Sequence, residues 1–160
     1  METEGVDIAV PEGYQIIIGQ SHFIKTVEDL YEALVTSMPG IRFGLSFCEA
    51  SGKSLIRSEG TDQGCARFAA KCAASIRAGH VFVVVLSGSF PINVLNRIKG
   101  VEEVAQVFCA TANPVTVVVA DSGKGRGVLG VVDGGYPQGE ESEEDVAERR
   151  GFLRKIGYKR

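Results

Sequence analysis

Val81-Phe-Val-Val-Val-Leu86 is one of the two longest apolar runs in the chain, and it stands between Gly79-His80 and Ser87-Gly88. A short apolar run rich in β-branched residues and bounded by glycines predicts a strand that is buried on both faces. Val115 to Ala120 is a second run of this kind. Both runs are far shorter than the roughly 20 residues of a membrane span. We therefore expect a fold built around a sheet, with no membrane partner.

Helical periodicity occurs on both sides of this strand. Apolar residues recur at helical spacing after Thr26, after Asp62, from Ile92 to Lys99 and after Ser142. Shorter apolar segments predict the other strands, at 14–18, 42–48, 54–57, 106–111 and 128–132. Helices interrupt the strands, but some neighbouring strands look hairpin-linked. The sequence thus predicts an α/β fold, a single-domain three-layer sandwich with a mixed sheet and helices on both faces.

Three helix ends carry local signals. Thr26 followed by Asp29, and Ser142 followed by Asp145, each resemble a capping box at a helix N-terminus. Gly79 stands where a left-handed residue is expected to end the second helix.

The composition is that of one globular domain. A chain of 160 residues with 44% hydrophobic and 23% charged residues can bury its own core, and we expect one domain over residues 1–160. A formal charge of -3 argues against binding to nucleic acid. The acidic N-terminus lacks the basic and apolar regions of a secretion signal, so we expect a cytoplasmic protein.

The cysteines predict core packing rather than a metal site. No C-x-x-C pair is present, and the chain has only two histidines to complete a cluster, so we expect no structural metal. Cys65 and Cys72 lie two helical turns apart on an apolar face, where free cysteine acts as a small hydrophobe.

Two glycine-rich segments resemble phosphate-binding motifs but lack their context. Gly52-Lys53-Ser54 has Phe47 where a P-loop needs its first glycine, and the G-x-G-x-x-G match at 125–130 is not followed by a helix. What remains is the turn from Ser122 to Gly127, which has exposed amides and two cations. It could hold an anion, or it could be an ordinary mobile turn.

Both histidines lie at strand ends. His22 follows a predicted strand and precedes a helix, where α/β sheets present ligands, and Lys25 is close by in the sequence. His80 opens the strand at 81–86, so it shares an edge with His22 only if the two strands are antiparallel. A packed or surface histidine is the alternative at each position.

Other polar residues fall in or beside predicted turns near strand ends. They are candidates for binding, although local turn chemistry alone can explain many of them. These residues are Glu49, Ser51, Lys53, Asn93, Asn96, Asn113 and Asp133.

Several stretches, in order along nearly the whole chain, together resemble the adenosine-specific kinase family. The match is weakest between Asp62 and Arg77. The stretches are Gly19-Gln-Ser-His-Phe-Ile-Lys-Thr-Val-Glu-Asp-Leu, Phe43-Gly-Leu-Ser-Phe-Cys-Glu-Ala-Ser-Gly-Lys, Ala78-Gly-His, Phe90-Pro-Ile-Asn-Val-Leu-Asn, Phe108-Cys-Ala-Thr-Ala-Asn-Pro, Gly125-Arg-Gly-Val-Leu-Gly-Val-Val-Asp-Gly and Phe152-Leu-Arg-Lys-Ile-Gly-Tyr-Lys.

The resemblance implies a homo-oligomer, a trimer, that binds adenosine, AMP or ATP and carries a phosphohistidine. Phosphoryl transfer is the implied chemistry, because a neutral imidazole nitrogen is a competent nucleophile near neutral pH. The reactive residue would be His22 or His80, and the loop position favours His22.

The resemblance also implies roles for charged residues. Lys25, Lys53 and Arg126 would neutralise phosphate. Glu49 and Asp133 would hold a Mg²⁺ ion that arrives with ATP, or would accept hydrogen bonds from the nucleoside hydroxyls.

Two other functions stay open at this point. One is a non-catalytic adenosine or AMP sensor in which the phosphohistidine is a regulatory mark. The other is an oligomeric structural domain whose loops only build contacts between subunits.

Overall fold

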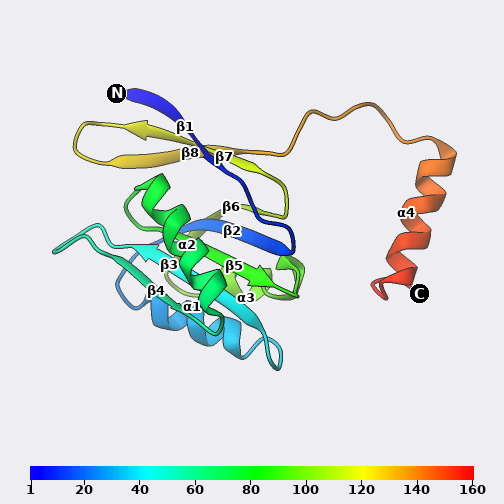
Figure 1. Ribbon diagram of the computed structural model, residues 1–160, viewed down its shortest axis with the longest axis horizontal. Helices are drawn as coiled ribbons and strands as arrows, with labels where there is room; N and C mark the ends of the chain where they lie inside the picture. The colour runs from blue at the N-terminus through cyan, green and yellow to red at the C-terminus, as the bar shows by residue number, and fades with distance from the viewer.

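Two antiparallel sheets form the frame of the protein, which a computed structural model describes over residues 1–160 (Figure 1). The five-stranded sheet has the order β4-β3-β5-β2-β6, and the three-stranded sheet has the order β1-β7-β8. The strands are β1 Glu2–Ile8, β2 Tyr14–Ser21, β3 Arg42–Cys48, β4 Ile56–Gly60, β5 Val81–Ser87, β6 Val104–Thr111, β7 Val115–Asp121 and β8 Arg126–Asp133. The helices are α1 Thr26–Val35, α2 Gln63–Ile76, α3 Leu95–Lys99 and α4 Glu143–Lys155, with a 3₁₀ turn at Pro91–Asn93.

Strand β5 is the centre of the five-stranded sheet, and its apolar run is buried on both faces as predicted. Val81, Val83 and Val85 face one core cluster, which contains the apolar side of α2 and the inner face of the three-stranded sheet. Phe82 and Leu86 face the other cluster, beneath α1 and α3. Helices therefore cover both faces of this sheet, and the predicted α/β class is confirmed.

The expected mixed sheet is corrected to an antiparallel one. Every strand pair in both sheets is antiparallel. Strands β2 and β3 run in the same direction, as a crossover through α1 requires, but β5 lies between them and is antiparallel to both. The helix pattern indicated the crossover correctly, but it gave no sign of the inserted strand.

Strand β1 was not predicted, because its sequence is mostly polar. It pairs with β7 at an edge, and only Val6 and Ile8 are buried. The return strand expected at 54–57 begins instead at Ile56 and continues to Gly60. The predicted third helix is divided into the 3₁₀ turn and α3.

Two of the three predicted helix ends differ in detail. Thr26 is the first residue of α1 and its hydroxyl donates to the Phe23 carbonyl at 2.7 Å, while Lys25 is the N-cap residue and makes no side-chain cap. Arg77, rather than Gly79, takes the left-handed conformation that ends α2, with φ of 52°.

Glycine allows α2 to lie directly against β3. A Cβ atom on Gly44 would come within 2.1 Å of the Ala66 backbone nitrogen. This close approach fixes the direction of α2, so that its C-terminal residue, Arg77, lies beside the end of β3.

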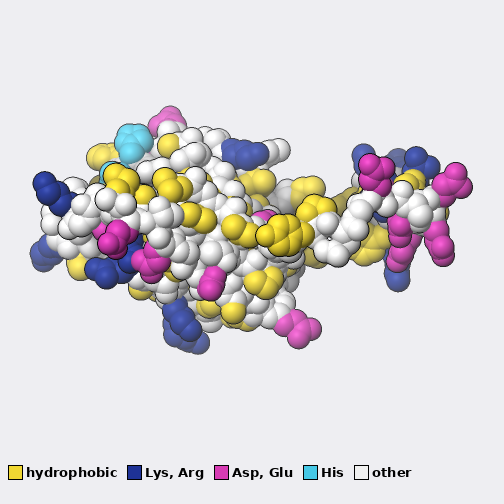
Figure 2. All heavy atoms as spheres, turned by 90° about the horizontal axis from the view of Figure 1, so that it is seen from above, with side chains coloured by type: hydrophobic (Ala, Val, Ile, Leu, Met, Phe, Trp, Pro, Cys, Tyr) yellow, Lys and Arg dark blue, Asp and Glu magenta, His cyan; other side chains and the backbone are white.

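The C-terminal arm, residues 134–160, stands away from the rest of the protein (Figure 1). The predicted capping box is present: Asp145 N donates to Ser142 Oγ and Ser142 N donates to the Asp145 carboxylate. No residue of α4 is buried, and charged side chains of both signs crowd its surface in Figure 2. None of the four helices is long and apolar enough to cross a membrane.

Candidate functional site

The two histidines lie at the same edge of the five-stranded sheet. Strands β2 and β5 pair antiparallel, so the end of β2 meets the start of β5. Ser21 N donates to the His80 carbonyl at 3.0 Å, directly before His22. The two histidines were expected to share an edge only if their strands were antiparallel, and the strands are antiparallel.

A cavity of about 710 Å³ opens between these histidines and the β3–β4 turn, and we call it the histidine cavity. Five of the predicted site residues line it: His22, His80, Glu49, Ser51 and Lys53. Its volume lies within the range of small-molecule sites.

The same cavity has lining residues that the sequence did not indicate. Phe23, Ile24 and Leu55 give it an apolar wall, and each of these side chains is about half exposed. Arg57, on β4, is the missed charged residue. The predicted hairpin could have revealed it, because Arg57 lies opposite Phe47 on the paired strand, close to Glu49.

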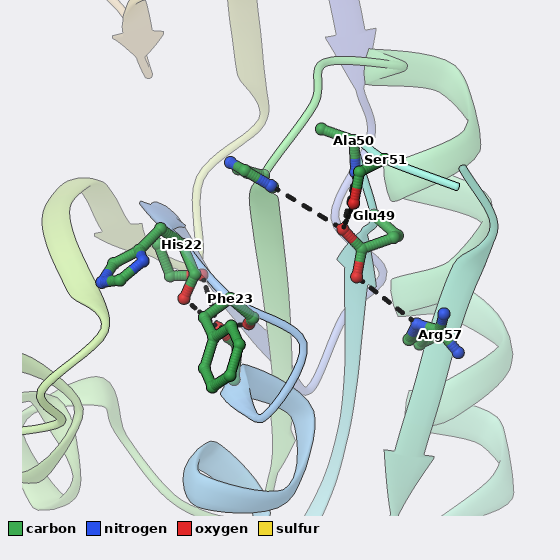
Figure 3. A network of polar contacts seen from close by, with 9 residues as sticks. His22, Phe23, Glu49, Ala50, Ser51 and Arg57 are labelled. Carbon is green, nitrogen blue, oxygen red and sulfur yellow. Dashed lines mark hydrogen bonds and ion pairs between the residues drawn. The ribbon is translucent and has the colours of Figure 1, made fainter. Parts of the chain in front are cut away.

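Glu49 is the buried carboxylate at the centre of this group. Its Oε1 accepts hydrogen bonds from Ala50 N at 3.0 Å and from Ser51 Oγ at 3.3 Å (Figure 3). Oε2 faces Arg57 Nε at 3.7 Å, and Oε1 faces His80 Nε2 at 3.8 Å. Burial alone would raise the pKa of Glu49, but these hydrogen bonds and the positive charge of Arg57 outweigh it and lower the pKa. Glu49 is an anion at neutral pH.

His80 is held firmly beside this carboxylate. Its ring stacks on Phe47 with 5.8 Å between ring centroids and 8° between planes, and about one third of the side chain is exposed. Its backbone N–H donates to the Cys48 carbonyl at 2.7 Å, and its φ of 62° is left-handed. Nε2 is the ring nitrogen that faces the carboxylate, and Nδ1 is the one that does not.

His22 and Arg57 are less firmly fixed. His22 is exposed, and its ring is turned away from Glu49 in Figure 3. Arg57 Nε is buried without a hydrogen-bond acceptor. This nitrogen faces Glu49 Oε2 at 3.7 Å, so the exposed part of the side chain, rather than Nε, is the candidate contact for an anionic ligand.

A second cavity, of about 470 Å³, lies on the other side of the β3–β4 turn, and we call it the arginine cavity. Arg77, Lys124 and Arg126 line it, and Glu49 lines both cavities. Arg126 was predicted as a phosphate ligand, and the structure places it here rather than with the histidines. Cys48 lies in this wall, but burial raises the pKa of its thiol to about 11, so it is not a thiolate at neutral pH.

Four predicted residues lie far from both cavities. Asp133 accepts hydrogen bonds from Thr111 Oγ1 and Asn113 Nδ2, at 2.8 and 3.0 Å, at the opposite end of the strands. Asn93 accepts from Phe90 N at the 3₁₀ turn, and Asn96 is exposed on α3. Asp133, Asn113 and Asn93 form hydrogen bonds within local turns, which is the alternative explanation that the sequence offered for these positions.

Lys25 is also outside the histidine cavity. Its ammonium pairs with Asp29 at 2.9 Å and lies 3.7 Å from the buried Glu103 carboxylate. Its charge is thus engaged within the chain and does not face the space between the histidines.

No group of three or more His, Cys, Asp or Glu side chains is arranged to hold a metal ion. Glu49 and Asp133, which the resemblance suggested as partners for Mg²⁺, lie at opposite ends of the strands and cannot share an ion. A Mg²⁺ ion that arrives with ATP would take Glu49 as its one carboxylate here, with phosphate oxygens and water as its other ligands.

Comparison with known proteins gives one family and one well-matched fold. A family model described as "Adenosine specific kinase" matches residues 6–159. The crystal structure of the PH1918 protein from Pyrococcus horikoshii OT3 is similar over 99% of this chain and 98% of that one, at 47% identity and a TM-score of 0.94. No protein with a curated description matches the chain.

Proposed function

The chain belongs to the adenosine-specific kinase family, and from this membership we propose that it phosphorylates adenosine through a phosphohistidine in the histidine cavity. The observation that carries the proposal is the Glu49 carboxylate 3.8 Å from His80 Nε2 in a cavity large enough for a nucleoside. A carboxylate that orients an imidazole is the arrangement that activates a histidine for covalent catalysis.

We assign the phosphate to His80 rather than to His22, which the loop position alone favoured. His80 has a carboxylate beside one ring nitrogen and a stacked aromatic ring that fixes its plane. His22 is exposed and forms no ion pair. It faces the same cavity and is the second candidate.

The transfer takes place in two balanced steps. In the first step, His80 Nδ1 attacks the terminal phosphorus of a nucleoside triphosphate. An N–P bond forms, and the P–O bond to the leaving nucleoside diphosphate breaks. Glu49 stabilises the positive charge that develops on the imidazole ring. The adenosine hydroxyl then attacks the phosphohistidine, which forms an O–P bond, breaks the N–P bond and releases the hydroxyl proton to solvent. Mg²⁺ on the triphosphate would neutralise part of its charge.

The other lining residues suit a nucleoside and its phosphate. Phe23, Ile24 and Leu55 offer an apolar surface for the flat base. Lys53 and Arg57 are the cations that line this cavity, and the Arg57 side chain is partly exposed. They would hold the oxygens of the phosphate as it moves.

Two further expectations belong to this proposal as well. They are the homotrimeric assembly that the resemblance implies and the cytoplasmic location that the N-terminal sequence favours. Sedimentation of the full chain measures the assembly directly.

A labelling experiment tests the function. Full-length protein is incubated with Mg²⁺ and ATP labelled on the γ-phosphate, with and without adenosine. We expect acid-labile label on the wild type and on His22→Ala, none on His80→Ala, and label in AMP only when adenosine is present. Label on His80→Ala but not on His22→Ala would move the reactive centre to His22.

Calorimetry with adenosine and AMP separates the other functions. Binding of either compound without label in AMP would contradict the kinase and leave a sensor. If neither compound binds, the histidine cavity is not a nucleoside site, and the structural role is the one that remains.

A further inference from the structure

Strained backbone marks the walls of both cavities. Four residues other than glycine have a positive φ, and all four line one cavity or the other. Phe23 and His80 line the histidine cavity, while Ser54 and Arg77 line the arginine cavity. Conformations of this kind persist where the side chain is needed, and they concentrate at ligand sites. The arginine cavity thus shares this feature with the proposed active site.

Three cations line the arginine cavity, together with the Glu49 carboxylate. Arg77 follows the end of α2, Lys124 lies in the β7–β8 turn, and Arg126 is the first residue of β8. A backbone bridge between Ala78 and Arg126 ties these two elements together. Lysine and arginine side chains gather at the end of the molecule opposite α4 in Figure 2, where Figure 1 places the β3–β4 and β7–β8 turns.

Only part of this positive charge is neutralised within the chain. Arg126 pairs with Glu4 at 2.7 Å and with Asp121 at 3.0 Å. Arg77 is exposed and takes no part in these pairs, and Lys124 is also exposed. A left-handed helix end is normally glycine or asparagine, so an unpaired arginine there is held at a strained position.

The arginine cavity continues toward the turn as a smaller hollow. This hollow has a volume of about 210 Å³, and it is lined by three cations, two glycines and the Asp121 carboxylate, which pairs with Arg126. On its other side the arginine cavity reaches Glu49, the carboxylate that it shares with the histidine cavity. A chain of phosphates in the arginine cavity would therefore end at Glu49, the residue that lies 3.8 Å from His80 Nε2.

We propose that the arginine cavity binds the polyphosphate chain of the phosphoryl donor, with Arg77 as its principal ligand. The inference rests on the proposed function in one respect, because it takes the nucleoside acceptor to occupy the histidine cavity. Guanidinium groups bind phosphate oxygens in pairs, and glycine turns allow close approach of the anion. Two adjoining cavities would place donor and acceptor on either side of Glu49.

Arg77→Gly is the decisive variant, because glycine accepts the left-handed backbone and removes the cation with its exposed side chain. Lys71→Ala, at an exposed lysine in the middle of α2, is the matched control for loss of one positive charge. Tripolyphosphate is the probe, and its dissociation constant is measured by calorimetry at fixed ionic strength on each full-length protein. We expect about a tenfold or greater weakening in Arg77→Gly and no change in Lys71→Ala.

The outcomes separate this proposal from the kinase itself. Tripolyphosphate binding that is unchanged in Arg77→Gly, or equally weakened in Lys71→Ala, overturns the donor subsite. If Arg77→Gly also forms phosphohistidine at the wild-type rate, the subsite is wrong while the kinase stands. Selective loss of tripolyphosphate binding in Arg77→Gly supports the subsite. If, in addition, no phosphate is transferred to adenosine, the proposed kinase function is overturned but the subsite is not.

Discussion

Residues other than glycine adopt the left-handed conformation at only one end of the strands. At the end away from the cavities, every left-handed residue is a glycine: Gly13, Gly40, Gly88 and Gly134. At the cavity end, Gly52 and Gly123 are left-handed too, but four further left-handed positions carry a side chain: Phe23, Ser54, Arg77 and His80. Each such residue costs about 1–2 kcal/mol relative to glycine. Glycine would make the turn more easily, so the retained side chains point to a role beyond folding.

The polar groups of the two ends differ in a similar way. Asp133 is satisfied by Thr111 and Asn113 at the far end. At the cavity end, the Glu49 carboxylate lies 3.7 Å from Arg57 Nε and 3.8 Å from His80 Nε2. Both distances are too long for a hydrogen bond, and Arg57 Nε has no other acceptor. A turn bonds its polar groups internally, whereas a ligand site leaves some of them free.

Removing the charge of one carboxylate at each end gives the largest expected contrast. Glu49→Gln keeps the shape of the side chain but removes the anion that orients His80, and we expect phosphohistidine formation to slow by about 100-fold or more. Asp133→Asn is the matched control and should label at the wild-type rate. The rate of label incorporation measures both. Equal rates in the two variants would remove the functional difference between the ends.

A substitution at the end of the strands away from the cavities should reduce stability without reducing ligand binding. Asp133→Ala leaves the Thr111 hydroxyl and the Asn113 amide without their acceptor, and we expect a loss of about 1–2 kcal/mol in the free energy of unfolding. Adenosine affinity should stay unchanged. Urea denaturation and calorimetry on the same preparation check both statements, and a loss of affinity would tie the far end to the site.

The strain at His80 can be measured by comparing two variants that both lack the ring. Glycine accepts a φ of 62°, whereas alanine retains the steric cost. We therefore expect His80→Gly to be about 1 kcal/mol more stable than His80→Ala in urea denaturation. A difference near zero would show that the backbone at His80 relaxes without cost.

The smallest expected effect concerns acid stability at the far end. Asp62 accepts a hydrogen bond from Cys65 N and pairs with Arg42, which lowers its pKa to about 2. Because its folded pKa lies below the unfolded value, its stabilising contribution is present above about pH 4 and is lost as the pH falls toward 2. Asp62→Asn keeps a cap acceptor but lacks the titrating charge. Its unfolding free energy should depend less on pH in this range, as thermal melts at pH 4, 3 and 2 would show.

The sequence indicated the parts of this site that lie close together along the chain. Glu49, Ser51 and Lys53 share one turn, so their closeness in the sequence already predicted that they line the same cavity. Whether His22 joins His80 depends on the pairing of β2 with β5, strands that are separated by two helices and a hairpin. No local pattern determines that pairing.

The candidate residues that lie outside the two cavities share a physical cause. Asn93, Asn113 and Asp133 have the composition of a binding loop, and only their internal hydrogen bonds show that they serve turns. Arg57 was missed because a lone arginine on a polar edge strand has no distinctive pattern of its own, and only its pairing with Phe47 in the hairpin points to it. Its importance comes from the burial of its Nε beside Glu49, which depends on the fold.

The exposed C-terminal helix gives the chain two very different rates of amide hydrogen exchange. A helix of 13 residues with no buried side chain is marginal in water, so the amides of α4 should exchange by local fraying. The amides of β5 lie between β2 and β3 with both faces covered, and they should exchange only when the whole body unfolds. Substitutions in either cavity should therefore change the exchange of β5 and leave that of α4 unaltered, so that each molecule carries its own internal reference.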